Sequence, residues 1–433
     1  MTVAQARGVH DAWVTLALCF LGLLAAQGVR LSFGTFMLPW EATFGADRGA
    51  VSLVSLLSFL VYGLTQPLVG RLADRCGARA VLSASVLLVG LSLFAVAAAR
   101  SLPQLALLYG VVASLGFGGA SGVAAAVAVT AWFAERRGLA FALIEAGFGA
   151  GQLLLVPGAL VAIDALGWRS TLVALGLALC LIVFPVLALL LRSRPGDVGL
   201  RPYGDRGAGT QGAAVAATDD GDGAAGAAAT TLRASVFATR AFWGLAAPFF
   251  VCGFTTTGMM DTHLVPYAHD MGFSTMATGA AVGFLAAFNI LGILASGPIA
   301  DRWDNRALLG GLYGIRAVSL LVLLAVHRPG QLLAFGALFG LVDFATVVPT
   351  QLLASRYFHG RGLGVVFGLL SLGHQLGSAL GAYLPGVVYD RTGSYAPVFV
   401  ASVAVLTGAA LACVALPPAH RQPRRPLAAV GAA

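Results

Sequence analysis

Among the polar side chains that lie inside long apolar stretches of the sequence, eight are singled out as best placed to do chemistry. They are Arg30, Glu145, Asp261, His263, Asn289, Arg316, Asp343 and His374. If these stretches cross a membrane, each charged group costs about 3 kcal/mol at bilayer depth on insertion scales. Such residues are rare, so their positions alone make them candidates for binding a solute or carrying a proton.

Four of these residues are predicted to bind a substrate: Arg30, His263, Asn289 and His374. An arginine can hold a carboxylate through two parallel hydrogen bonds. A histidine titrates near neutral pH and suits a step that moves a proton. The alternatives are structural: Arg30 could pair with a buried acid, His374 could hydrogen-bond within a glycine-rich helix, and His263 could be a rim residue.

Three other residues are predicted to serve in coupling or as a buried charge pair: Asp261, Arg316 and Asp343. Asp261 is two residues before His263, so the two side chains point to different faces of a helix. Arg316 and Asp343 fall near the middle of consecutive apolar segments. A structural pair is the first interpretation, and a cavity role for Asp343 is the alternative. Glu145 is predicted to belong to an inner gate or to take a proton.

The composition indicates an integral membrane protein. Of 433 residues, 58% are hydrophobic and only 10% are charged, against about 25% charged in soluble domains. A spanning helix needs about 20 apolar residues, and the chain divides into twelve such segments. We therefore expect an all-α membrane protein. The net charge of +8 does not imply nucleic acid, and the sequence has no motif for a metal, a cofactor or an enzyme nucleophile.

A polar motif occurs twice at the same spacing. Gly70–Arg79 and Gly297–Arg306 each separate two apolar runs, and Asp301 follows Asp74 by 227 residues (301 − 74). Pro39 and Pro266 repeat at the same offset (266 − 39) and are expected to mark outer helix ends. The repeat predicts two six-helix halves. The motif is interpreted as a polar loop that latches the halves on the cytoplasmic side, or alternatively as a loop that only retains arginines there. The predicted gate residues are Gly70, Asp74, Arg75, Gly77, Arg79, Glu145, Asp301, Arg302 and Arg306.

The arginines predict the orientation. Of the 26 basic residues, 19 fall on one side of the twelve segments, 5 on the other and 2 inside them. The positive-inside rule then places both termini in the cytoplasm of a bacterial-type inner membrane. The predicted parts are an N-terminal bundle at 1–191, a disordered linker at 192–238, a C-terminal bundle at 239–417 and a tail at 418–433.

The first motif copy, Gly70–Arg79, resembles the signature between the second and third helices of the major facilitator superfamily. This resemblance implies two six-helix bundles related by a pseudo-two-fold axis, with alternating access. The stretch Trp132–Ala140 and the glycines Gly147, Gly149 and Gly151 look like the bacterial monocarboxylate and oxalate/formate porter branch. That branch implies small carboxylates, moved with protons or by exchange.

The branch also implies basic residues in helices eight and eleven. His374 stands at the helix-eleven position, and Asn289 looks like the polar position of helix eight. One turn later Ile293 stands where the branch tends to place a cation. The carboxylate clamp must therefore come from elsewhere, or the substrate differs.

The leading hypothesis is a monomeric secondary transporter for a small organic anion, either coupled to protons or working by exchange (symport or antiport). A second hypothesis is proton-driven efflux of drugs or cations through Glu145, Asp261 and Asp343. A third is a non-transporting sensor that acts through the linker and tail.

Overall fold

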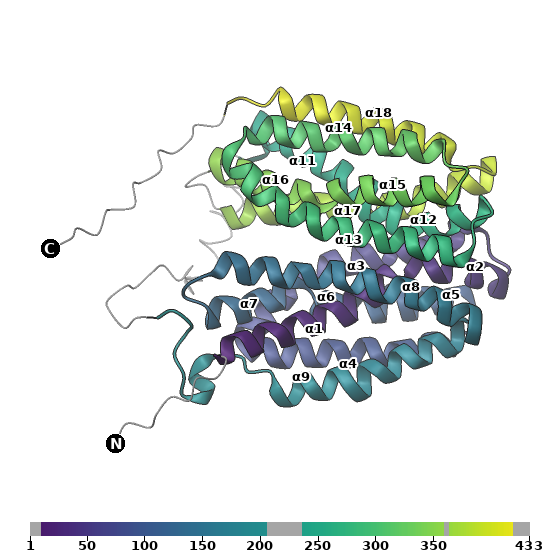
Figure 1. Cartoon of the computed structure of the whole chain (residues 1–433). Coiled ribbons are helices and arrows are strands. Elements are labelled where there is room, and N and C mark those ends of the chain that lie inside the picture. The colour runs from purple at the N-terminus through teal and green to yellow at the C-terminus, as the bar shows by residue number, and fades with distance from the viewer. Residues whose placement is uncertain (1–9, 206–235, 359–362, 419–433) are drawn as a thin grey trace, which may run out of the picture.

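In the computed structural model, residues 10–205, 236–358 and 363–418 are described, and their regular structure consists of helices. Figure 1 shows two stacked helical layers, with the first and last of the described residues, 10 and 418, at the same end of the molecule. We call this the terminal end and the opposite one the far end. The first layer contains α1 (Asp11–Leu31), α2 (Phe33–Phe44), α3 (Arg48–Cys76), α4 (Ala78–Ala97), α5 (Leu102–Leu105), α6 (Ser114–Gly119), α7 (Gly122–Trp132), α8 (Arg137–Ala178) and α9 (Phe184–Leu190).

The second layer is built from the C-terminal half of the chain. It contains α11 (Arg240–Gly253), α12 (Met259–Asp270), α13 (Thr275–Arg302), α14 (Asn305–Leu324), α15 (Pro329–Val342), α16 (Val347–Tyr357), α17 (Leu363–Thr392) and α18 (Ala396–Val414). Wider π-helical turns at Ala106–Ala113, Leu179–Val183 and Phe254–Gly258 join consecutive helices, and short 3-10 turns occupy Pro195–Val198 and Phe344–Thr346.

The helices account for the expected membrane crossings. Ten helical stretches of the described residues are long and apolar enough to span a membrane. One of them, 138–190, has 53 residues, about 80 Å of helix at 1.5 Å per residue, and it bends at Gly167, where φ is 77°. It therefore crosses twice. Residues 240–270, formed by α11, a π-turn and α12, supply a further crossing.

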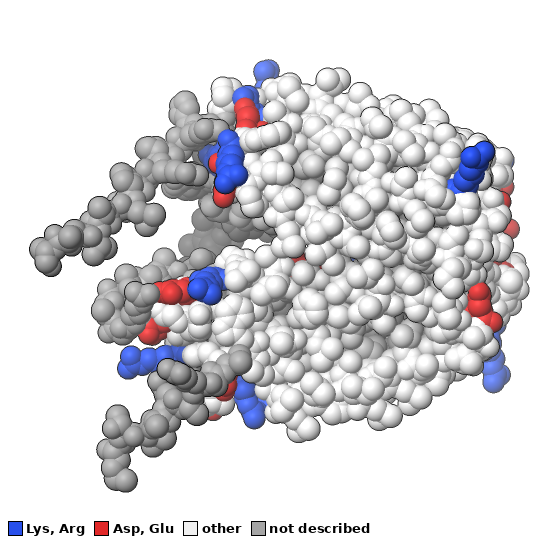
Figure 2. Space-filling view, viewed as in Figure 1, with Lys and Arg blue, Asp and Glu red and all other residues white. Residues whose placement is uncertain are grey.

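Each half has its own hydrophobic core. One cluster of buried residues extends from Ala12 to Leu191, and the other is drawn almost entirely from Val236 to Leu416. The halves meet along three helix pairs: α3 with α17, α8 with α13, and α2 with α12. In Figure 2 the molecule is hollowed between the halves at the terminal end and is closed at the far end.

Two local predictions were wrong. Residues 70–76 are the last two turns of α3 rather than a loop, and the break comes only at Gly77, where φ is 82°. The helix continues beyond the apolar run because arginine and alanine, which occur in these residues, are good helix formers. Likewise Pro39 and Pro266 lie inside α2 and α12 instead of ending a helix.

The predicted linker and tail fall mainly outside the described residues, which omit 206–235 and 419–433. The first part of the linker is packed on the N-terminal half. The Tyr203 amide donates to the Trp132 carbonyl at 2.7 Å, and the Tyr203 ring lies edge-on to Trp13. Residues 192–205 are therefore held against the first bundle.

Candidate functional site

Arg30 is a predicted site residue that lines an internal cavity. It lies in the last turn of α1 and is 7% exposed. Its Nε donates to Gln27 Oε1 at 2.9 Å. The Gln27 amide nitrogen in turn donates to the carbonyls of Phe117 and Ala120, at 2.9 and 2.8 Å. These two bonds fix the orientation of the amide, so its oxygen is available to position the guanidinium.

The Arg30 cavity is lined by both halves of the molecule. It is small, about 10 Å³ in volume, which is room for about one water molecule. Its walls include Ser55, Ser58 and Tyr109 from one half and Asp261 and Thr262 from the other. The guanidinium carbon lies 4.3 Å from the ring centroid of Tyr62. Among the described residues no carboxylate is within ion-pair distance of Arg30. A buried cation with spare donors thus faces a cavity.

Asp261 lies on α12, across the interface from Arg30. Its Oδ1 accepts a 2.9 Å hydrogen bond from Gln152 Nε2, on α8 of the other half. It lines the Arg30 cavity and also a second one of about 10 Å³, together with Leu31 and Gln152. Asp261 is therefore the acidic group of this site.

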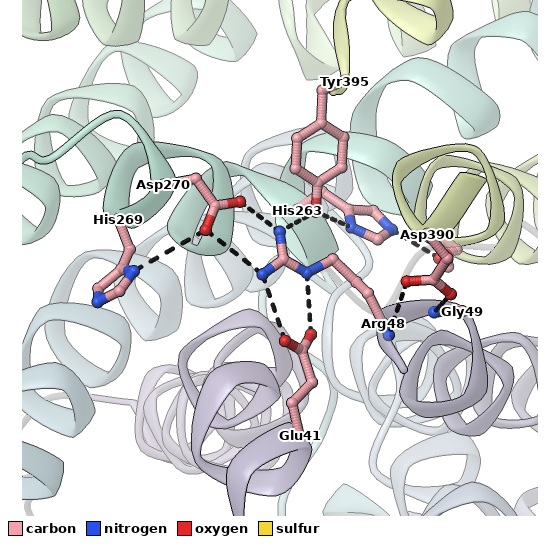
Figure 3. Close-up of polar contacts among 9 residues, drawn as sticks. Glu41, Arg48, Gly49, His263, His269, Asp270, Asp390 and Tyr395 are labelled. Atoms are coloured by element: carbon pink, nitrogen blue, oxygen red, sulfur yellow. Dashed lines mark hydrogen bonds and ion pairs between the residues drawn. The ribbon is translucent and has the colours of Figure 1, made fainter. Parts of the chain in front are cut away.

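His263 points away from these cavities, in agreement with its spacing from Asp261. The imidazole is fully buried. Its Nδ1 lies 3.0 Å from the hydroxyl of Tyr395, and its Nε2 lies 2.7 Å from the carbonyl of Ala382. It thereby joins a polar cluster at the far end, which Figure 3 shows.

We call this cluster the far-end gate, and its centre is Arg48. Arg48 Nε lies 2.9 Å from Glu41 Oε1, and the guanidinium also forms an ion pair with Asp270. A second contact to Asp270 runs from Nη2 to Oδ1 at 3.4 Å. Glu41 belongs to the same half as Arg48, whereas Asp270 comes from the other half (Figure 3). The arginine therefore ties the two halves together.

Two further contacts close the far-end gate. The Asp390 carboxylate accepts from the main-chain amides of Arg48 and Gly49, at 3.0 and 2.6 Å, and so caps α3 from the other half. Arg48 Nη1 donates to the Tyr395 hydroxyl at 3.2 Å. Burial raises the pKa of that hydroxyl, so it keeps its proton.

Sequence reasoning missed this cluster. Arg48 is one of the five basic residues on the side with fewer arginines, and one signal in the sequence could have singled it out. Arg48 begins a helix, where the macrodipole disfavours a positive charge. Acidic partners are therefore expected beside it.

A break within one spanning segment brings together Arg316, Asn289 and Asp343. The segment is interrupted between α15 and α16. Arg316 Nη2 donates to the carbonyls of Val342, at 2.7 Å, and Asp343, and Asn289 Oδ1 accepts from the Phe344 amide at 3.3 Å. The contact of Arg316 with Asp343 thus runs through the main chain of Asp343. These side chains stabilise free carbonyl and amide groups at the break.

Of the four residues predicted to bind substrate, Arg30 lines the cavity and the other three lie elsewhere. His374 is 8% exposed and packs its ring 4.7 Å from that of Phe249. Neither cavity described above has His374 or Asn289 in its wall.

The predicted cytoplasmic gate residues lie at the terminal end, and two of them make equivalent contacts. Arg79 Nε donates to the Ala188 carbonyl at 2.8 Å, and Arg306 Nη1 donates to the Leu416 carbonyl at 2.7 Å. Each binds the end of the last spanning segment of its own half. The remaining members are distributed over helix ends and helix interiors: Gly70, Asp74 and Arg75 in α3, Gly77 after it, Glu145 in α8, and Asp301 and Arg302 in α13.

Glu145 is exposed although it lies two turns inside α8. A methyl group built on Gly122 would lie 2.9 Å from its Oε1, so Glu145 packs beside α7.

Comparison with known proteins gives a consistent assignment. The family model described as Major Facilitator Superfamily matches residues 18–326 and 288–432. The chain is 28% identical to an uncharacterized MFS-type transporter, YcxA, of Bacillus subtilis, over 88% of this chain and 90% of that protein. It is also 28% identical to human monocarboxylate transporter 11, over 94% and 83% of the two chains.

A solved structure supports the fold. The crystal structure of a bacterial homologue of the human lysosomal transporter Spinster, in an inward-facing and occupied conformation, superposes with a TM-score of 0.70 at 16% identity. The match covers 95% of this chain and 94% of that one. The predicted all-α fold of two helical bundles is confirmed.

Proposed function

Because the chain belongs to the Major Facilitator Superfamily, whose members are membrane transporters and not enzymes, we propose that it carries a small monocarboxylate-like anion by alternating access. Transport is driven by protons or by exchange. Relatives named as monocarboxylate transporters, such as the human protein with 28% identity, support this substrate class.

The observation that carries the proposal is the environment of Arg30. Its guanidinium is buried, is positioned by Gln27 through Nε alone, and faces a cavity between the halves. Among the described residues no carboxylate forms an ion pair with it, and a buried charge without a close partner is costly. A carboxylate that reaches Arg30 when the halves move apart would offset that cost through two charge-assisted hydrogen bonds, whereas a cationic solute would be repelled.

Asp261 supplies a physical reason for coupling to protons. Its carboxyl group lines the same cavity as Arg30. When Asp261 is ionised, its negative charge opposes a second anion beside Arg30. When it is protonated, Arg30 is free to hold the solute. Proton and anion therefore bind together, and this argument favours symport.

We further propose that the terminal end faces the cytoplasm, with both termini inside. The hollow between the halves in Figure 2 then opens inward, and the far-end gate closes the route to the outside. Alternating access requires that this gate open while the terminal end closes.

The test is uptake into proteoliposomes with an imposed proton gradient and radiolabelled lactate, pyruvate and oxalate. We expect accumulation of at least one carboxylate, with Arg30→Gln reducing the initial rate by at least tenfold. Arg100→Gln is the control, because Arg100 is exposed at the loop between α4 and α5. No carboxylate uptake, or proton-driven export of a cationic dye that depends on Asp261 and survives Arg30→Gln, would refute the anion proposal.

A further inference from the structure

We propose that His263 is a proton-sensitive switch in the far-end gate, and that its protonation favours the state in which the far end is open. In the proposed orientation this end faces the outside, so external acid would promote opening. The switch would operate whatever anion the central cavity accepts.

The hydrogen bonds determine the state of the imidazole in the closed gate. The Ala382 carbonyl can only accept, so Nε2 at 2.7 Å must carry a hydrogen. In the neutral ring Nδ1 is then an acceptor, and the Tyr395 hydroxyl at 3.0 Å donates to it. The same hydroxyl accepts from Arg48 Nη1 at 3.2 Å. A continuous chain of hydrogen bonds, in which each group donates to the next, therefore runs from Arg48 through Tyr395 and His263 to the Ala382 carbonyl.

Protonation of His263 disrupts this chain. Nδ1 would become a donor, so the Tyr395 hydroxyl would lose its acceptor while two cationic groups pointed at its oxygen. One hydroxyl oxygen would then separate the imidazolium from the Arg48 guanidinium, and His263 has no exposed surface to hydrate its charge. Burial of an uncompensated charge is unfavourable.

The neighbouring charges do not offset this effect. Arg48 of α3 shares the Tyr395 hydroxyl with the imidazole, and Tyr389 of α17 stacks on the guanidinium at 4.0 Å. The nearby carboxylates already have other donors: Glu41 and Asp270 bind the Arg48 side chain, and Asp390 binds the first amides of α3. On its own helix, His263 is accompanied by Tyr267, which donates to the Leu323 carbonyl, and by exposed His269.

The direction of the effect follows from linkage. The closed gate holds the imidazole neutral, whereas an open gate hydrates it, and an unperturbed imidazole titrates near pH 6.5. Protons therefore bind the open state preferentially. For one proton, the ratio of open to closed molecules rises by up to about tenfold per pH unit below that range.

A distance measurement across the far end tests the switch. The full chain in lipid nanodiscs, with Cys76→Ser, carries spin labels at Ala42→Cys on α2 and Met271→Cys just after α12, both exposed positions. Between pH 8 and pH 5.5 we expect the long-distance population to grow by severalfold. In His263→Gln this growth should disappear, because an amide can donate to Ala382 and accept from Tyr395 without titrating.

The matched control is His269→Gln. His269 is 71% exposed and its Nδ1 lies 3.9 Å from Asp270 Oδ1, so its charge could also disturb the gate. The proposal requires that His269→Gln keep the pH response. A response that survives His263→Gln, one that vanishes with His269→Gln, or none in the parent protein would overturn it.

Side-chain nitrogen NMR of labelled histidine provides a second measurement if His263→Gln does not fold. We expect the Nε2–H tautomer for His263 at pH 8, and a titration that coincides with the change in distance. An imidazole that titrates while the distances stay constant would also contradict the switch.

Discussion

Asp390 Oδ2 accepts a 2.6 Å hydrogen bond from the amide of Gly49, so the start of α3 in one half is capped by the end of α17 in the other. Its Oδ1 accepts from the neighbouring Arg48 amide. The local N-cap residue, Asp47, forms no side-chain capping bond. A helix cap that comes from the opposite half exists only while the far end is closed.

We therefore expect Asp390→Ala to favour the open far end. Loss of an N-cap costs about 0.5–2 kcal/mol, which corresponds to a shift of about 2- to 30-fold in the ratio of open to closed molecules. The spin-label distances described above measure that ratio. Asp47→Ala removes a neighbouring carboxylate that caps nothing, so it should leave the ratio within about twofold. Equal effects of the two substitutions would contradict the cap.

The two acidic partners of Arg48 should behave differently. Glu41 is in the same half as Arg48 and can remain paired in both states, whereas Asp270 must separate from it when the far end opens. Asp270→Asn should therefore raise the open population by severalfold at pH 8, and Glu41→Gln should change it much less. Cross-linking of Ala42→Cys to Met271→Cys should fall in the Asp270 variant alone. A larger effect of Glu41→Gln would contradict this role.

Gly34 permits close approach of the halves. A methyl group at this position would lie 2.7 and 2.8 Å from the carbonyl oxygens of Asp261 and Thr262, too near for ordinary contact. Gly34→Ala should therefore separate α2 from α12 and increase the open population in the distance measurement. Gly311→Ala in α14 is the control, since it meets no atom within 4 Å. Unchanged distances in Gly34→Ala would show that the added methyl group fits without separating α2 from α12, and would contradict the prediction.

Asp261 allows a test of coupling. Asp261→Asn mimics the protonated carboxyl and keeps an acceptor for Gln152, 2.9 Å away in the native protein. We expect proton-driven accumulation to be lost while exchange of internal for external carboxylate continues at a comparable rate. In the parent protein, by contrast, the rate of anion accumulation should rise as the external pH falls. Proton-driven accumulation by Asp261→Asn would exclude this carboxyl as the coupling group.

Arg316 should matter for stability. It is fully buried and donates to two carbonyls at the break between α15 and α16. Hydrogen bonds to charged groups contribute about 1.5–3 kcal/mol each, so Arg316→Met should lower the thermal unfolding midpoint in detergent by several degrees. Arg100→Met, on the exposed surface, should leave it unchanged. An unaltered midpoint for Arg316→Met would refute the structural role.

The sequence by itself determined the membrane-spanning architecture. Twelve apolar segments, two copies of one motif and the lone arginine of helix one could be read from residue order, because hydropathy and short-range spacing are local properties. Arg79, a predicted gate residue of the first motif copy, binds the Ala188 carbonyl. Its counterpart Arg306 binds the Leu416 carbonyl in the other half, so the two copies of the motif make equivalent contacts.

Only the tertiary structure decided which polar residues share a site. Asp390 and Arg48 are separated by 342 residues, and residue spacing carries no information about a contact that forms when two independently packed halves meet. For the same reason His263, an expected binding residue, joins the far-end gate, and Gln27, an unremarked amide, positions Arg30. Burying a charge requires a partner, but which partner is determined by how helices from different halves pack.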